Sequence, residues 1–197
     1  MFQLLRVQRF SYLYTSIDGV SEGVGGHVCY IIGITFSSGR TLSVDTACIK
    51  RKFYSACNSV LSKLGSASEL VLLQLVHSKC LPLLSYCLGA MHLSRQDIKQ
   101  LSVASNDAFR RIFHFHCWES VKELIYFCGE LDFVHMYDLC WWKFLQKIHQ
   151  NFSYGATLLK HIDIGTDYFE FVYNCHSSNV SCMRFAVISK FAETCHR

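Results

Sequence analysis

The chain has 197 residues, of which 51% are hydrophobic and only 17% are charged, whereas about 25% charged is usual for a globular domain. This composition excludes intrinsic disorder, and the length is sufficient for a sizeable core. The net charge of +4 is unevenly distributed, because residues 40–122 carry eleven Lys or Arg against five Asp or Glu. Such a basic stretch is typical of a surface that binds a polyanion. A solvated helix face is the alternative interpretation of the same composition.

The eleven cysteines are odd in number and scattered through apolar neighbourhoods. This pattern predicts free, buried thiols in a reducing compartment rather than a disulfide framework. Arg6 and Arg9 interrupt the first apolar run, so no secretory signal is readable. The charge-free stretch over residues 80–94 is shorter than the roughly 20 residues of a spanning helix. We therefore expect an intracellular protein, cytoplasmic or nuclear, that is not secreted and does not contact a membrane.

The N-terminal part of the chain favours strands. Residues 1–27 show no clear period, and their glycines make the second half loop-like, so they form an unassigned leader. Residues 28–36 are rich in β-branched and aromatic side chains, and residues 40–44 alternate between apolar and polar. The Ser37-Ser38-Gly39 turn signal between them predicts a β-hairpin over residues 28–45.

Amphipathic helices are predicted over residues 46–150, which carry a 3.6-residue apolar period. Asp45 or Thr46 can cap the first helix, and Pro82 should kink or split the second. Capping boxes are predicted at residues 66–69 and 94–97. The five helices are expected at 46–64, 70–84, 94–112, 118–128 and 133–148, with Gly65 and Gly129 ending the first and the fourth.

The pattern weakens after Asn151. Residues 151–197 form a weakly helical tail, with a short strand or helix at 167–173 and a last helix near 181–194. The predicted fold class is therefore mainly α: a helical bundle over 46–150 preceded by a short β-hairpin.

Several sequence motifs of known catalytic sites are missing from this chain. The chain has no Asp-Asp pair, no Walker-type glycine loop and no His-Glu-x-x-His. Two Cys/His groupings, at 114–128 and in the tail at 175–196, lack the paired close spacing of a zinc site. We expect no catalytic residue, no metal and no cofactor in this chain.

Two groups of basic residues suit phosphate binding. Lys50, Arg51 and Lys52 begin a helix beside aromatic residues, and Arg110 and Arg111 lie on the polar side of the third helix. Cations so placed could contact the backbone of a duplex or hybrid. Exposed basic residues without a ligand would give the same pattern, and the residues alone do not choose between the two.

The order and spacing of several segments resemble a known family. These segments are residues 30–34 (Tyr-Ile-Ile-Gly-Ile), 38–45, 50–61, 78–86 and 106–113. Together, over about residues 28–148, they are similar to the region after the catalytic palm in reverse transcriptases of non-LTR (LINE-type, jockey-like) retrotransposons. Ile32 stands where the family usually has leucine, and neither the Phe/Tyr-Ala-Asp-Asp motif nor a C-terminal zinc knuckle is recognisable.

This resemblance implies a function. The hairpin would correspond to the primer grip, and the helices to the thumb and connection that hold an RNA–DNA template–primer hybrid. The residues implied in weak backbone contacts are Arg40, Lys50, Arg51, Lys52, Arg110 and Arg111. Without the catalytic aspartates, the chain is expected to be a truncated fragment that is inactive alone as an RNA-directed DNA polymerase and that self-associates through exposed apolar surface. The alternatives are a cellular all-α protein-interaction domain and a degenerate transposon remnant with no activity.

Overall fold

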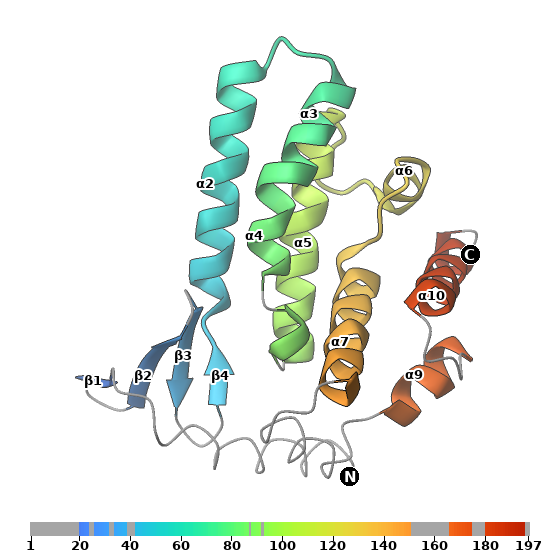
Figure 1. Cartoon of the computed structure of the whole chain (residues 1–197). Helices are drawn as coiled ribbons and strands as arrows, with labels where there is room; N and C mark the ends of the chain where they lie inside the picture. Colours follow the sequence, from blue (N-terminus) through green and yellow to red (C-terminus); the bar gives the residue numbers. More distant parts are fainter. Residues whose placement is uncertain are drawn as a thin grey trace. The chain divides into compact units, whose positions relative to one another are not determined.

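The computed structural model describes residues 20–23, 26–31, 34–38, 42–86, 88–91, 93–150, 166–174 and 180–195. The chain forms two compact units, Met1–Lys52 and Phe53–Arg197. Each unit has its own architecture: the first is built around a small antiparallel sheet, and the second is helical (Figure 1).

The first unit contains four strands that follow one another in a meander. They pair antiparallel in the order β1-β2-β3-β4, with bounds β1 (Val20–Gly23), β2 (Gly26–Ile31), β3 (Ile34–Ser38) and β4 (Leu42–Val44). The pairing of β3 with β4 places Ser38 opposite Leu42 and Phe36 opposite Val44, which confirms the predicted hairpin.

The sheet is larger than the sequence pattern predicts. The apolar run over residues 28–36 does not form one strand, because β2 ends and β3 begins within it, with Ile31 paired to Ile34. Strand β1 also lies inside the unassigned leader, in the half whose glycines indicated a loop, and its Ser21 pairs with Val28. The β-branched composition indicated strands correctly, but it did not show where an uninterrupted apolar run turns back on itself.

Helix α2 (Thr46–Leu64) begins and ends where the sequence predicts. The Asp45 carboxylate accepts hydrogen bonds from the backbone N–H groups of Ala47 at 3.0 Å and Cys48 at 3.3 Å. These bonds satisfy donors that have no partner within the helix. Of the two candidate caps, Asp45 and Thr46, Asp45 is therefore the one that caps α2.

The second predicted helix is split near its proline, as the sequence predicts. It consists of α3 (Glu69–Leu75), the π-helix η1 (Val76–Cys80) and α4 (Leu81–Ser85), and the 3₁₀-helix η2 (Leu88–Ala90) follows. Pro82 lies in the first turn of α4, where its missing N–H costs least. The capping box predicted at residues 66–69 is wrong, because Ser68 is the N-cap and its side chain makes no capping bond.

The stretch Glu69–Ala90 is long and apolar enough to cross a membrane, judged by length and composition alone. This is weak evidence, since the core helix of a soluble protein passes the same test. One side of the stretch is buried, including Val76, Cys80 and Leu84, while Gln74 and Lys79 are exposed. The absence of membrane contact stays a prediction.

The remaining helices build the rest of the second unit. They are α5 (Arg95–Ile112), α6 (Lys122–Phe127), α7 (Phe133–Gln150), α9 (Thr166–Tyr173) and α10 (Val180–Cys195). The predicted capping box at the start of α5 is confirmed, since Ser94 and Asp97 bond each other's backbone N–H. The fourth helix is shorter than predicted, because residues 113–121 form a loop before α6.

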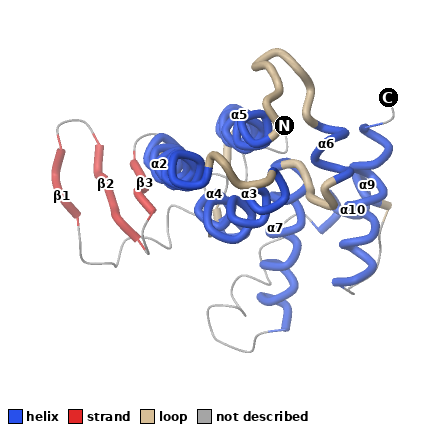
Figure 2. Tube along the Cα trace, turned by 90° about the horizontal axis from the view of Figure 1, so that it is seen from above, coloured by secondary structure: helices blue, strands red, loops and turns tan. Residues whose placement is uncertain are grey.

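The C-terminal helices complete the core and are not a separate tail. Helix α10 packs against α6, α7 and α9 (Figure 2). Its Met183, Val187 and Phe191 are fully buried, and Phe169 of α9 joins the cluster that α7 contributes to. The apolar pattern weakens after residue 150, but the packing continues across that point. Helices before and after it share apolar contacts within one unit.

Candidate nucleic-acid interface

Helix α2 carries positive charge with no negative charge on it. Its 19 residues include Lys50, Arg51, Lys52 and Lys63 but no Asp or Glu. Lys50 is half-buried, and the other three are exposed. Cations and short polar side chains are the groups that contact nucleic-acid backbone oxygens. The remaining exposed polar residues of the helix are Ser55, Asn58, Ser59 and Ser62.

Arg40, the sixth residue predicted to bind nucleic acid, lies outside the described residues. Lys50, Arg51 and Lys52 belong to the first unit, and Arg110 and Arg111 belong to the second. Each group is therefore treated by itself.

Arg111 contacts the part of α2 that belongs to the second unit, residues 53–64. Its Nη1 donates a 2.7 Å hydrogen bond to Oδ1 of Asn58, and both residues are exposed. This bond holds the Arg111 guanidinium against α2, a helix without acidic residues, where an approaching phosphate could reach it. Sequence spacing placed Arg111 on a polar face but could not show that this face meets α2.

Arg110 has a different environment from its neighbour. Its Nε and Nη2 both donate to the backbone oxygen of Glu119 at 3.1 Å, and its Nη1 donates to Oδ1 of Asp107 at 2.8 Å. The side chain is only 17% exposed. Three donors of the guanidinium are thus engaged within the chain, and they anchor the loop after α5 to the body of that helix.

The same carboxylate connects α5 to α2. The Tyr54 hydroxyl donates to Oδ2 of Asp107 at 3.1 Å. Burial raises the pKa of Tyr54 to about 12, and the charge and hydrogen bond of Asp107 act in the same direction. Burial also raises the pKa of Cys57, one turn along α2, to about 12, with neighbouring Cys80 contributing.

We expect the stability of the second unit to fall in alkaline solution, partly through Tyr54. The unfolded tyrosine ionises near its ordinary value of 10.0, whereas the folded one keeps its proton to about 12. Its stabilisation is therefore complete below pH 10 and is lost as the pH rises through 12. Urea unfolding across pH 10–12 should show a shallower loss of stability for Tyr54→Phe than for the unchanged protein. An equal loss in the two proteins would contradict a role for this hydroxyl.

The loop between α5 and α6 has a defined geometry. Phe113 is the C-cap of α5, His114 has a positive φ of 57°, and the Phe115 N–H donates to the Arg110 oxygen at 2.9 Å. This six-to-one bond is that of a Schellman motif, which usually has glycine at the position that His114 occupies. The loop therefore leaves the helix along a fixed path.

A tight turn follows in the same loop. The Glu119 N–H donates to the His116 oxygen at 3.1 Å, and the Glu119 carboxylate accepts from the His116 N–H at 2.6 Å. The rings of His116 and Trp118 stack in parallel, with centroids 4.6 Å apart and planes 4° apart. Trp118 is nevertheless 76% exposed. The sequence indicated Trp118 only as the start of the predicted fourth helix and gave no sign of this stacking.

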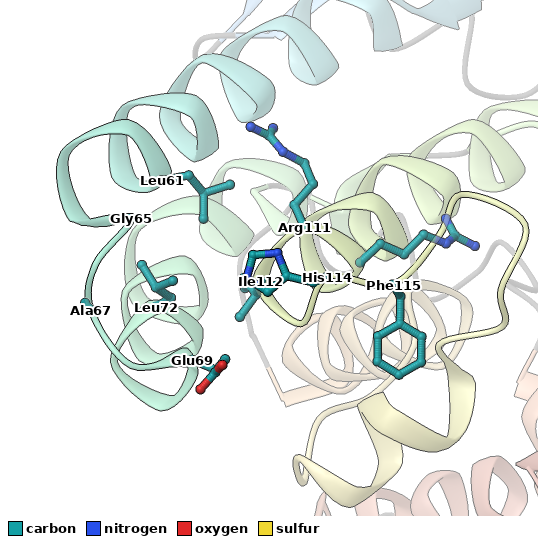
Figure 3. Close-up of a pocket in the computed structure, with 10 residues that line it drawn as sticks. Leu61, Gly65, Ala67, Glu69, Leu72, Arg111, Ile112, His114 and Phe115 are labelled. Carbon is teal, nitrogen blue, oxygen red and sulfur yellow. The ribbon is translucent and has the colours of Figure 1, made fainter.

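An open pocket of about 460 Å³ adjoins this loop. Arg111, His114 and Phe115 of α5 and the loop lie on one side of it, and Leu61 of α2 and Glu69 of α3 lie on the others (Figure 3). Its wall combines cations with one carboxylate and several apolar groups. Such a mixed lining does not by itself specify a ligand.

A second cluster of ionisable groups involves Asp132, His135 and Cys195. Asp132 caps α7 by accepting from the backbone N–H of His135 at 3.0 Å, and it also bonds the Nδ1 of that ring at 2.5 Å. The Cys195 thiol points to the Lys122 oxygen at 3.8 Å, and burial, followed by the charge of Asp132, raises its pKa. A protonated, buried thiol is not an activated nucleophile.

Metal ligands do not gather in the part of the chain that the structure describes. No group of three or more His, Cys, Asp or Glu side chains there could hold an ion. The eight cysteines whose side chains are described are all free, and Cys57, Cys80 and Cys195 are buried.

Comparisons with protein-family models, with curated proteins and with solved structures found no match for this chain.

Proposed function

We propose that this chain is the primer-grip, thumb and connection region of a non-LTR retrotransposon reverse transcriptase, and that it holds an RNA–DNA hybrid by its backbone. The observation that carries the proposal is the acid-free helix α2, with exposed cations near both its ends. Contacts of this kind bind phosphates without reading sequence. The proposed role is to position a template–primer and involves no catalytic residue, metal or cofactor.

The six residues implied by the resemblance divide into two roles in this proposal. Arg51, Lys52 and Arg111 are exposed and are proposed to contact phosphates, with Lys50 and Arg40 assisting. Arg110 is a positioning residue, because its donors hold the loop after α5.

We expect replacement of Lys50, Arg51 and Lys52 by alanine to weaken binding of a blunt RNA–DNA hybrid. Each phosphate contact releases counterions, so the slope of log affinity against log salt should become shallower by up to about 2 to 3 units. Fluorescence anisotropy of a labelled hybrid over a range of salt concentrations measures this slope. Helicity should be unchanged, because alanine favours helix at least as well as the residues replaced.

A second triple variant provides the matched control. Replacing Lys143, Lys147 and Lys160 by alanine removes the same charge from elsewhere in the chain, and Lys143 and Lys147 are exposed on α7. A solvated helix face predicts equal effects of the two variants. If both bind the hybrid alike, the phosphate-binding role of residues 50–52 is wrong.

The alternative is an all-α protein-interaction domain, and one observation favours it. Phe127, Phe171 and Phe185 are each more than 70% exposed, on α6, α9 and α10. Exposed aromatic side chains can form a surface for a protein partner or for self-association. Concentration-dependent sedimentation together with no measurable hybrid binding would favour this alternative over the proposed function.

A further inference from the structure

The turn that carries the exposed Trp118 is fixed by several hydrogen bonds. Arg110 fixes the Glu119 oxygen with two donors, and the Glu119 side chain bonds the His116 backbone across the turn. His116 covers one face of the indole at 4.6 Å. Because the residue remains 76% exposed, the opposite face of the indole is open to solvent. An apolar ring supported in this way loses little freedom when a second flat ring stacks on it.

Cations lie close to the loop that carries this exposed ring. Arg110, Arg111 and His114 line the adjoining pocket together with Leu61 of α2. Against them stands Glu69 on the opposite wall, while the Glu119 carboxylate is engaged with the His116 backbone. Single-stranded nucleic acid is bound by this combination of cations for the backbone and aromatic rings for the bases.

We propose that Trp118, supported by His116, stacks on an unpaired nucleobase of a single-stranded segment adjoining the hybrid. The inference rests on the proposed function and adds to it a site for unpaired nucleotides that is made by residues of the second unit alone. Stacking is tolerant of base identity, because every base has a π-face. The site therefore distinguishes unpaired from paired nucleotides without selecting a sequence.

The test compares a blunt RNA–DNA hybrid with the same hybrid carrying a single-stranded overhang. The unchanged protein should bind the overhang form more tightly, and Trp118→Ala should lose about 5- to 150-fold of that preference while binding the blunt hybrid as before. Trp118→Phe keeps a ring and should retain part of the preference. Phe127→Ala, at a similarly exposed aromatic residue on α6, is the control and should change neither affinity.

The outcomes separate this inference from the proposed function. If the unchanged protein binds both hybrids equally well, or if Trp118→Ala and Phe127→Ala behave alike, the stacking site is wrong while hybrid binding stands. If neither hybrid binds, the proposed function fails and the inference fails with it. A surface meant for a protein partner would give equal binding of the two hybrids, and that result overturns the inference.

Discussion

Gly89→Ala is expected to destabilise the helical unit by about 3 kcal/mol, near the upper end of what overpacking costs. A Cβ at this position would lie 2.5 Å from the carbonyl oxygen of Cys140 and 2.9 Å from Cβ of Phe144. Both atoms belong to α7, and neither is the far end of a flexible side chain. The 3₁₀-helix η2 would therefore have to move away from α7.

That movement would disturb a buried junction. Leu88 and Met91, on either side of the glycine turn, are almost completely buried. The Tyr137 hydroxyl of α7 also donates to the Met91 oxygen at 3.0 Å. Urea unfolding measures the loss, with the exposed neighbour Ala90→Ser as a control that should stay within about 0.5 kcal/mol. A loss below 1 kcal/mol for Gly89→Ala would mean that this junction adapts freely.

Arg110→Ala is expected to cost about 2 kcal/mol, because it removes charge-assisted hydrogen bonds from a largely buried guanidinium. Arg110→Lys should recover little of the loss, since an ammonium cannot reproduce the planar fork that bonds the Glu119 oxygen and Asp107 together. Unfolding experiments measure both variants, and hydrogen exchange of the loop over residues 113–120 should become faster.

Arg111→Ala is the matched control for this prediction. It removes the same side chain from the next position, where one exposed hydrogen bond to Asn58 is lost, and its cost should be within about 0.5 kcal/mol. In hybrid binding the order should reverse, with Arg111→Ala weakening the salt-dependent affinity more than Arg110→Ala does. Equal costs in stability for the two variants would contradict the anchoring role of Arg110.

The helices were predictable from the sequence because their signals are local. The apolar repeat and an acidic cap give both ends of α2, and the pairing of Ser94 with Asp97 marks the start of α5. These signals depend on residues within one or two turns of each other. Where local composition was ambiguous, as in the apolar run over residues 28–36, the prediction missed a reversal of the chain.

The candidate site was predictable only in part because it depends on contacts between distant residues. Periodicity places Arg110 and Arg111 on polar positions of one helix, but it cannot show that one bonds Glu119 while the other bonds Asn58 of another helix. The exposed Trp118 had a visible signal, since two histidines and a phenylalanine precede it in a short segment. The sequence could not show the turn that stacks the ring of His116 on that of Trp118.

The π-helical turn at Val76–Cys80 has a consequence for the phase of the helix that contains it. Leu72, Val76, Cys80 and Leu84 recur every four residues and are all buried. In an uninterrupted α-helix, positions spaced by four drift by about 40° per step, so the last of them would leave the line of the first. A wider turn in the middle opposes this drift. The insertion thus brings the two halves of the helix back toward a common phase, and both halves bury side chains of the same four-residue spacing.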